Sequence, residues 1–215
     1  MMFTELFVPK GAHTREELDQ LAQRLTTHGL HDSPHALSEP AAERADPGVL
    51  EFLESITHVV VHEVDVWIAG GRRQDAGAVP RYVVRVYVPG PWRKPLSEHL
   101  IARITRALAD AQGDPGRLYE RPDCEVHVLG VPDGGYGAFG RVIDDSILMD
   151  MISDATSGIA EVPEGMGVDP VCGTTVSMTE PGAVTAEVDG VTFQFCCPQC
   201  RGTFLKRQRN KVAGE

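Results

Sequence analysis

The sequence lacks long hydrophobic runs and has little positive charge for its size. None of the apolar stretches in its 215 residues reaches the roughly 18 residues that a membrane-spanning helix needs, so we expect no membrane partner. The N-terminus, MMFTELFVPKG, has no basic region followed by a long apolar stretch, which argues against a secretory signal and favours a cytoplasmic protein. Acidic residues outnumber basic ones by 31 to 20. Because a nucleic-acid partner requires a basic face, we expect none.

Charge and cysteine divide the chain into two regions. After Gly165 acidic and basic residues balance, so the net charge of −11 arises in the residues before it. Cys124 stands alone, whereas the other cysteines fall between residues 172 and 200. The intervening stretch SDATSGIAEVPEGMG is small, polar and contains Gly and Pro, as linkers do. We therefore predict a body at residues 1–150, a linker at 151–165 and a cysteine module at 166–212.

The body contains an internal repeat. FTELFVPKG and YVVRVYVPG are alternating stretches that end in Val-Pro, and both are typical of β-strands. Apolar residues at helical spacing follow each, and then a second strand pattern, THVVVHEV or CEVHVLGV. Each copy closes on a Gly-rich turn, WIAGGR or YGAFGR. This order predicts an α+β fold in which two βαβ units, residues 1–73 and 80–145, form one four-stranded sheet with two helices on one face.

The second face of the predicted sheet has no helix from the body to cover it. The strands carry apolar residues on both faces, so this face requires a cover. Self-association is the simplest cover, and we therefore expect a homo-oligomer.

This doubled pattern of strand, glycine turn, helix, strand and Gly-rich hairpin resembles the tautomerase superfamily over about residues 2–145. The resemblance implies a trimer with sites between neighbouring subunits. Enzymes of the family use an N-terminal proline as base or nucleophile, since its ring amine is partly unprotonated near neutral pH. Counting back from the turn glycine Gly11 places that proline at Met2. The chain therefore lacks the main catalytic group of the family.

Five side chains of the body are candidates for a site that binds a small anionic substrate. Arg81, Arg85 and Arg141 stand at strand starts and hairpin ends, where an arginine can bind a carboxylate; an ordinary surface role is the alternative. His62 and His127 lie on matching strands of the two copies with glutamates nearby. That pattern suits acid–base chemistry or a metal, although packed and hydrogen-bonded histidines are also common.

The cysteine module has the pattern of a turn, a hairpin and a helix. DPVCG is a tight turn, and AVTAEVDGVTFQF alternates around Asp-Gly, a strong signal for a two-residue hairpin turn. The following CCPQCRGTFLKRQR opens a helix, with Pro198 suited to its first turn.

This arrangement allows the cysteines to form a metal site. Cys172, Cys196 and Cys200 can converge on one point, and Cys197 or an oxygen ligand such as Asp169 can take a fourth position. Soft thiolates suit Zn(II), Cu(I) or an iron–sulfur centre. A module of about 45 residues has a small core, which a bound metal would stabilise.

Two other interpretations of the cysteines remain open. Cys197-Pro198-Gln199-Cys200 is also a C-x-x-C pair of the redox type, but no thioredoxin-like βαβ pattern surrounds it. A structural disulfide is the second alternative, and the absence of a secretion signal disfavours it.

The module also resembles the YHS domain, which is related to the TRASH metal-binding modules, over about residues 165–209. The resemblance lies in a Cys-Gly turn followed by Phe-Cys, three residues, Cys, three residues and Phe. It implies a small treble-clef-like domain that binds a heavy metal through Cys172, Cys196 and Cys200. The additional cysteine at position 197 leaves the number of ligands open.

The sequence therefore predicts a heavy-metal (Zn or Cu) binding protein, with the cysteine module carried on an oligomeric, tautomerase-like scaffold. The alternative is an isomerase- or lyase-like enzyme that acts on a small carboxylated or carbonyl substrate at an intersubunit pocket, without the N-terminal proline and with a structural zinc. A third possibility is a protein-docking module with a structural zinc.

Overall fold

The computed structural model describes residues 2–31, 45–74, 77–158, 161–178 and 183–213. Contacts within the chain divide it into two compact units. Unit 1 comprises Met1–Ser33 and Ile56–Val131, and unit 2 comprises Pro34–Ser55 and Pro132–Glu215. Unit 2 thus combines two separate pieces of sequence, one of which interrupts the first repeat. Among the helices of the described residues, none has both the length and the apolar content to cross a membrane.

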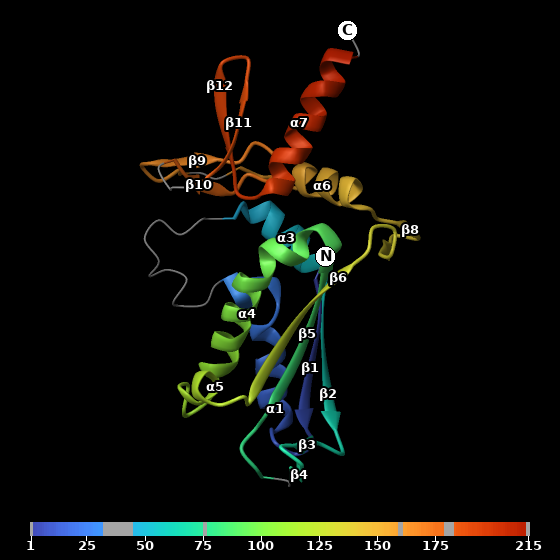
Figure 1. Cartoon of the computed structure of the whole chain (residues 1–215), viewed down its shortest axis with the longest axis vertical. Helices are drawn as coiled ribbons and strands as arrows, with labels where there is room; N and C mark the ends of the chain where they lie inside the picture. Colours follow the sequence, from blue (N-terminus) through green and yellow to red (C-terminus); the bar gives the residue numbers. More distant parts are fainter. Residues whose placement is uncertain (1, 32–44, 75–76, 159–160, 179–182, 214–215) are drawn as a thin grey trace. The chain divides into compact units, whose positions relative to one another are not determined.

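Unit 1 is built on a four-stranded sheet (Figure 1). Its strands are β1 (Met2–Pro9), β2 (Thr57–Val64), β5 (Tyr82–Pro89) and β6 (Cys124–Val131). The strand order is β2-β1-β5-β6, in which β1 runs parallel to β2 and β5 runs parallel to β6. The antiparallel pairing of β1 with β5 joins the two pairs. This topology confirms the prediction of two βαβ units that share one sheet.

Helices cover one face of this sheet (Figure 1). They are α1 (Arg15–Arg24), α2 (Thr27–His31), the 3-10 turn η2 (Gly90–Trp92), α4 (Arg93–Ala109) and α5 (Arg117–Glu120). A capping box starts α1, because Thr14 and Glu17 each accept a hydrogen bond from the backbone N–H of the other. Leu21 of α1 and Leu108 of α4 belong to one buried cluster with Val84 of β5. The core of unit 1 therefore lies between the helices and the sheet. Burial of each such side chain stabilises the unit by about 1.5–3 kcal/mol.

The opposite face of the sheet mixes aromatic, aliphatic and charged side chains. Strand alternation places Phe3, Glu5 and Phe7 of β1 on this face, in register with residues of β5 that include Tyr87 and Val83. All of these side chains are only partly buried in the single chain. This open face is the surface on which the sequence predicted self-association.

The two Gly-rich turns of the repeat form short hairpins. In unit 1, β3 (Ile68–Ala69) pairs with β4 (Arg72–Arg73), and in unit 2, β7 (Gly137–Ala138) pairs with β8 (Arg141–Val142). The unit 1 turn uses Gly70 and Gly71, whose φ angles of 56° and 72° are left-handed and favour glycine.

Besides the β7–β8 hairpin, the described residues of unit 2 combine helices with two small antiparallel sheets. Its further elements are α3 (Pro47–Ser55), α6 (Asp145–Asp154), β9 (Met166–Val168), β10 (Thr175–Ser177), β11 (Val184–Val188), β12 (Val191–Phe195) and α7 (Pro198–Ala213). β9 pairs with β10, and β11 pairs with β12 around Asp189-Gly190, as the Asp-Gly signal predicted. Phe195 of β12 and Phe204 of α7 are buried, with ring centroids 5.3 Å apart. The hairpins and the helix thus form a mixed α+β unit that is compatible with a treble-clef-like cysteine module.

Asp46 ties the N-terminal piece of unit 2 to the rest of that unit. Its side chain is fully buried, and Oδ1 accepts hydrogen bonds from the backbone N–H groups of Gly48 and Ser157, both at 2.9 Å. Oδ2 accepts a bond from the N–H of Gly158 at 2.7 Å. Asp46-Pro47-Gly48 therefore starts α3 in unit 2. The same tripeptide in the second repeat, Asp114-Pro115-Gly116, precedes α5 in unit 1.

The helix α6 crosses the boundary that the sequence suggested between body and linker. It continues to Asp154, beyond the predicted boundary at residue 150. The domain boundaries at 1–150, 151–165 and 166–212 stay predictions. Compared with the second repeat, the first contains an additional polar segment with three histidines at residues 28–45, of which residues 32–44 lie outside the described residues.

Candidate metal centre

The turn between β9 and β10 presents Cys172. This turn is closed by two backbone hydrogen bonds, from Gly173 N to Asp169 O and from Asp169 N to Thr174 O, each 2.9 Å long. Gly173 has a φ of 71°, and a Cβ at this position would lie 2.9 Å from Oδ2 of Asp46. Glycine is therefore required both by the left-handed backbone and by the close approach of the Asp46 carboxylate.

The junction between β12 and α7 presents the sulfurs of Cys196 and Cys200. Cys196 follows the last residue of β12, and Cys200 lies in the first turn of α7, just after Pro198. Phe204 packs one turn further along α7 against Phe195 and Phe193. These aromatic contacts fix the helix on the hairpin, and so they fix the two cysteines relative to each other.

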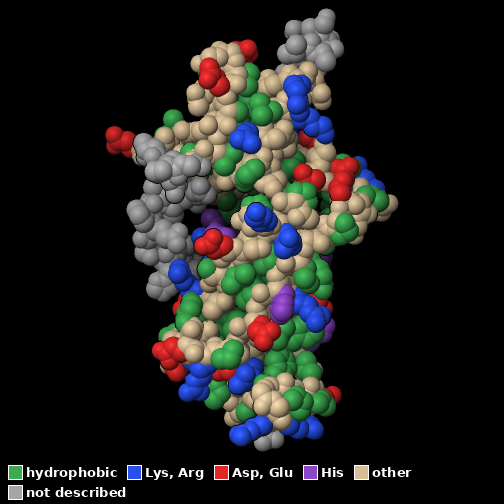
Figure 2. Space-filling view, viewed as in Figure 1, with side chains coloured by type: hydrophobic (Ala, Val, Ile, Leu, Met, Phe, Trp, Pro, Cys, Tyr) green, Lys and Arg blue, Asp and Glu red, His purple; other side chains and the backbone are tan. Residues whose placement is uncertain are grey.

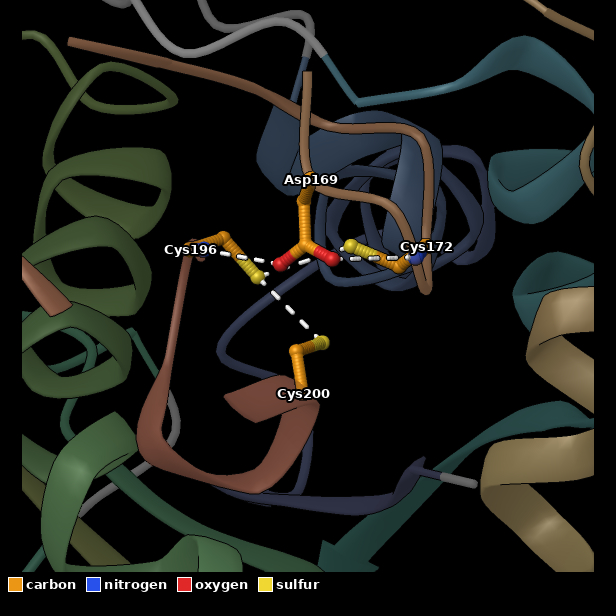
Figure 3. A group of neighbouring side chains, drawn as sticks. All are labelled: Asp169, Cys172, Cys196 and Cys200. Carbon is orange, nitrogen blue, oxygen red and sulfur yellow. Dashed lines mark hydrogen bonds between the residues drawn. The ribbon is translucent and has the colours of Figure 1, made fainter. Parts of the chain in front are cut away.

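The three sulfurs and one carboxylate converge (Figure 3). One ligand atom each from Asp169, Cys172, Cys196 and Cys200 lies within 4.8 Å of every other. The Sγ atom of Cys196 is 3.5 Å from Sγ of Cys172 and 3.7 Å from Sγ of Cys200. A tetrahedral zinc with Zn–S bonds of about 2.3 Å has sulfur–sulfur edges of about 3.8 Å. The spacing of the sulfurs is therefore close to that of a tetrahedral thiolate site, and this cluster could hold a metal ion.

Asp169 lies beside the sulfurs and is fully buried. Its Oδ1 accepts hydrogen bonds from the N–H groups of Val171 at 2.8 Å and Cys172 at 3.3 Å, and its Oδ2 accepts one from the N–H of Cys196 at 2.8 Å. The carboxylate thus joins the two segments that carry the cysteines. Burial, together with the negative charge of the Cys172 thiolate, raises the pKa of Asp169 to about 6, although the N–H donors partly offset this.

Hydrogen bonds among the thiols shift their pKa values in opposite directions. Hydrogen bonds from the Cys196 and Cys200 thiols lower the pKa of Cys172, and the same contact raises the pKa of Cys196. A thiolate at Cys172 is therefore favoured while Cys196 keeps its proton. A bound cation would take the place of such protons, because metal binding to thiols releases them.

Cys197 lies beside this cluster rather than in it. Its sulfur is not one of the four mutually close ligand atoms, and it accepts a hydrogen bond of 3.5 Å from the backbone N–H of Cys200. That position is typical of a residue that caps the first turn of a helix. Asp169, which the sequence offered as an alternative fourth ligand, is the residue that the structure brings to the three sulfurs; a role for Cys197 as a ligand stays a prediction.

Three of the catalytic candidates lie on the open face of the unit 1 sheet. Nε2 of His62 is 3.2 Å from Oε1 of Glu5, and its ring stacks on Phe7 with centroids 4.5 Å apart. The guanidinium of Arg85 lies 5.0 Å from the centre of the Phe7 ring. His127, in register with Arg85, has Nε2 3.4 Å from Oε2 of Glu125.

The other two candidates lie elsewhere. Nη2 of Arg81 is 3.0 Å from Oδ1 of the buried Asp123. Arg141 is exposed at the start of β8, in unit 2. The structure therefore groups His62, Arg85 and His127 on one surface, whereas Arg81 belongs to a second cluster that sequence reasoning did not identify.

Comparisons with known proteins give structural similarity only. No protein-family profile matches the chain, and no curated protein matches it. A native fused 4-OT structure is 21% identical over 65% of this chain and 94% of its own, with a TM-score of 0.46. For N1, a member of the cis-3-chloroacrylic acid dehalogenase family, the identity is 17%, the coverage 66% and 82%, and the TM-score 0.45. For the macrophage migration inhibitory factor of Toxoplasma gondii these values are 17%, 66%, 99% and 0.41.

These solved structures are members of the tautomerase superfamily, the family that the sequence repeat resembles. The resemblance of the cysteine module to YHS and TRASH domains stays a prediction.

Proposed function

We propose that this protein binds a heavy-metal ion, with zinc as the first choice, through Cys172, Cys196 and Cys200. The single observation that carries the proposal is the convergence of these three sulfurs with the carboxylate of Asp169, all within 4.8 Å of one another. Asp169 either supplies the fourth ligand atom or leaves that position to a water or another donor while it holds the two cysteine segments together.

The number and arrangement of the donors favour a metal over redox chemistry as the role of the cluster. A disulfide joins two sulfurs at about 2.05 Å and has no need of a third. Here Cys196 has one sulfur on either side at 3.5 and 3.7 Å, and a buried carboxylate lies alongside. Three soft donors around one point, from two separate segments, suit a cation that bridges those segments.

The mixed ligand set favours zinc over copper(I). Thiolates bind both metals, but a carboxylate oxygen is a harder ligand that zinc accepts and copper(I) disfavours. This distinction holds if Asp169 coordinates the ion, and copper(I) remains the alternative if only the sulfurs do. Reduced thiols are needed in either case, in agreement with the cytoplasmic location expected from the sequence.

In this proposal unit 1 acts as an assembly platform. Its open sheet face carries partly buried aromatic residues such as Phe3, Phe7 and Tyr87, which a second copy of the chain would cover. The resemblance of the repeat to the tautomerase superfamily makes a trimer the expected assembly. The enzyme alternative rests on the five candidate residues and on a pocket between subunits, and it stays a prediction.

The test is elemental analysis of the purified full-length protein together with serine variants. We expect about one zinc per chain for the native protein, and loss of this zinc in Cys172→Ser, Cys196→Ser and Cys200→Ser. Cys124→Ser is the matched control, because Cys124 belongs to unit 1 and should leave the metal content unchanged. Replacement of zinc by cobalt(II) should give thiolate-to-cobalt absorption bands that the same three variants lose.

Two results would contradict the proposal. One is a native protein that binds neither zinc nor copper under reducing conditions, after incubation with either ion. The other is equal metal content in the native protein and in the three cysteine variants.

A further inference from the structure

Cys197 is one of the four cysteines of unit 2, but its sulfur is not among the four mutually close ligand atoms of the candidate metal centre. It stands directly before Pro198, the first residue of α7, in the N-cap position. Its Sγ accepts a hydrogen bond of 3.5 Å from the backbone N–H of Cys200, the third residue of the helix. Because an N-cap side chain bonds to this amide, the start of α7 directs the Cys197 sulfur toward Cys200.

Cys197 is more accessible than the buried sulfurs beside it. Cys200 and Cys172 have exposed fractions of 3% and 6%, whereas Cys197 is only partly buried. Its thiol makes side-chain hydrogen bonds with Cys196 and Cys200. A small solute can therefore reach a thiol that touches two of the three sulfurs of the centre.

The geometry favours Cys200 as the partner of Cys197 in a disulfide. The Cα atoms of two bridged cysteines usually lie about 4.4–6.8 Å apart. Those of adjacent residues are about 3.8 Å apart, so a bridge between Cys197 and Cys196 would be strained. Cys200 stands three residues further on, where side chains on one turn of a helix are neighbours. Of its two sulfur neighbours, Cys197 is therefore better placed to bond to Cys200.

In the proposed metal centre Cys197 is the thiol that stays free. Cys172, Cys196 and Cys200 would share their sulfur lone pairs with the ion. The thiolate both attacks oxidants and binds metals, so a sulfur that coordinates an ion is less available for oxidation. Cys197 would therefore react with an oxidant first. Loss of Cys200 from the ion would then leave two sulfurs, fewer protein donors than a tetrahedral zinc site normally has.

We propose that a hydroperoxide releases the metal from this centre by oxidising Cys197, which then bonds to Cys200 and removes it from the ion; this inference rests on the metal-binding function proposed above. In the first step the Cys197 sulfur attacks one oxygen of the hydroperoxide. An S–O bond forms and the O–O bond breaks. The thiol proton passes to the departing oxygen, so an alcohol leaves, or water if the oxidant is hydrogen peroxide, and Cys197 becomes a sulfenic acid.

The second step closes the disulfide. The Cys200 thiolate attacks the sulfur of the Cys197 sulfenic acid, an S–S bond forms, the S–O bond breaks and hydroxide leaves. The bond between Cys200 and the metal is lost in the same step. In total two electrons pass from the two sulfurs to the peroxide. A dithiol can reverse the change by thiol–disulfide exchange, which returns both cysteines to the reduced form.

The surroundings of Cys197 favour the departure of an oxygen anion. The N-terminus of α7, a helix of 16 residues, carries a partial positive charge. Arg201, Lys206 and Arg209 of this helix are exposed, and Figure 2 shows Lys and Arg side chains along it. Positive charge placed where negative charge develops lowers the barrier to such a step.

The experiment follows the release of zinc from the full-length protein, after loading with zinc and removal of the excess. Hydrogen peroxide is added, catalase destroys the remainder at set times, and a chromogenic chelator measures the free zinc. Peptide mass spectrometry without reduction then locates the disulfides. We expect a Cys197–Cys200 disulfide for every zinc released, and renewed zinc binding after treatment with dithiothreitol.

Cys197→Ser tests the role of the free thiol. Serine is also a favourable N-cap residue, so the start of α7 should be kept. Peroxide should release zinc from this variant more slowly than from the native protein, by at least about tenfold.

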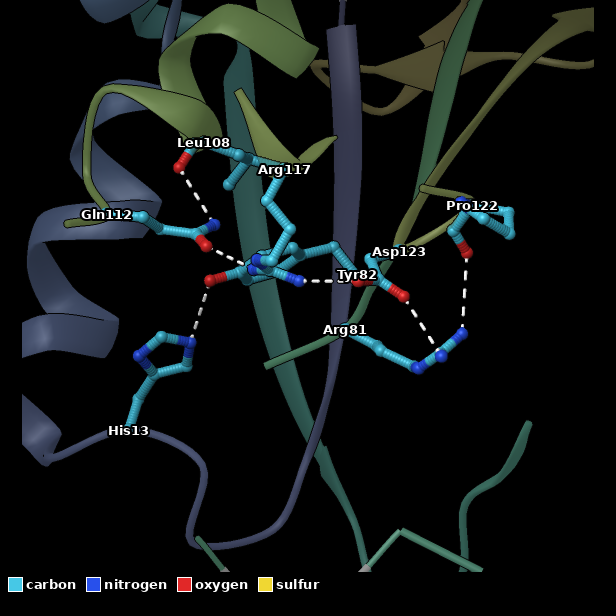
Figure 4. A network of polar contacts seen from close by, with 8 residues as sticks. All are labelled: His13, Arg81, Tyr82, Leu108, Gln112, Arg117, Pro122 and Asp123. Atoms are coloured by element: carbon cyan, nitrogen blue, oxygen red, sulfur yellow. Dashed lines mark hydrogen bonds and ion pairs between the residues drawn. The ribbon is translucent and has the colours of Figure 1, made fainter. Parts of the chain in front are cut away.

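Cys124→Ser is the matched control and should release zinc at the native rate. Cys124 belongs to unit 1, where it follows Asp123 of the polar network in Figure 4. Burial raises the pKa of Cys124 to about 11, so its thiol stays protonated and reacts slowly with peroxide.

The outcomes separate this inference from the metal-binding function. Equal rates of release in the native protein and Cys197→Ser would overturn the inference alone, and so would a disulfide that joins other cysteines. Loss of zinc from Cys197→Ser before peroxide is added would also overturn it, because Cys197 would then be a ligand. A native protein that binds no metal would contradict the proposed function, and the inference with it.

Discussion

Replacement of Asp169 by asparagine removes one negative charge beside the three sulfurs and keeps the shape of the side chain. In the native protein both carboxylate oxygens accept backbone N–H groups, from Val171 and Cys172 on one side and from Cys196 on the other. An asparagine has only one oxygen. If it faces Val171 and Cys172, its NH₂ group meets the N–H of Cys196 at a distance near the native 2.8 Å, and two donors then oppose each other.

The expected cost follows from this geometry. A buried N–H left without an acceptor costs about 1–3 kcal/mol, which corresponds to a factor of about 5 to 150 in an equilibrium constant. Because the lost contact positions Cys196, we expect the zinc affinity of Asp169→Asn to fall by a factor in this range, and by more if the carboxylate is itself a ligand. The stability of the metal-free unit should fall as well, since the bond joins two segments of unit 2.

Competition with a zinc-binding dye measures the affinity, and thermal unfolding of the metal-free protein measures the stability. The cobalt(II) spectrum shows whether the ligand set has changed. Asp189→Asn is the matched control: Asp189 lies at the β11–β12 turn with a φ of 52°, a conformation that asparagine also adopts. Native affinity and native stability in Asp169→Asn would refute the reasoning, because the carboxylate would then neither bind the metal nor hold the cysteine segments.

Three further predictions follow from other parts of the chain. Burial raises the pKa of Asp46, but hydrogen bonds from Ser157, Gly158 and Val49 outweigh this effect and lower the pKa overall. The ionised carboxylate therefore stabilises the fold above the unfolded pKa of about 3.9, and this stabilisation is lost as the pH falls through the lower folded pKa. Asp46→Asn should therefore weaken the acid dependence of unfolding, measured by circular dichroism, and native acid dependence would contradict this. Cys197→Ser should keep a full complement of zinc by elemental analysis, because its sulfur lies outside the four-atom cluster; loss of zinc would make it a ligand. Phe7→Glu should lower the mass of the assembly in light scattering, since it places a charge on the open sheet face, and an unchanged mass would place the interface elsewhere.

Local patterns in the sequence were sufficient to predict the main strands of the sheet, the helix of each repeat and the order of these elements. Alternation with period two identified the strands, because alternate side chains of a strand face opposite sides of the sheet. The doubled order of elements then led to the two βαβ units and the four-stranded sheet. In the cysteine module, the Asp-Gly turn and the helix-starting Pro198 placed Cys196 and Cys200 at the junction of a hairpin and a helix.

Contacts between distant parts of the chain could not be read from those patterns. Asp46 and Ser157 are far apart in sequence, and nothing local to either residue indicates that one binds the other. The predicted first βαβ unit, residues 1–73, includes Asp46, yet the contacts of this residue lie in unit 2. A local signal shows that an aspartate can start a helix, but it does not show which unit that helix joins.

The sequence by itself therefore indicated the main strands and helices of the repeat and the three cysteines of the candidate metal site, because periodicity, turn residues and cysteine spacing are local properties. Only the tertiary structure brought the carboxylate of Asp169 to the sulfurs of Cys172, Cys196 and Cys200, since no local pattern shows which carboxylate will lie beside a given thiol. It alone brought Arg81 and Arg117 to one buried carboxylate, Asp123. Surface and buried arginines look the same in a sequence, and the charge that a cavity presents depends on which side chains folding brings together.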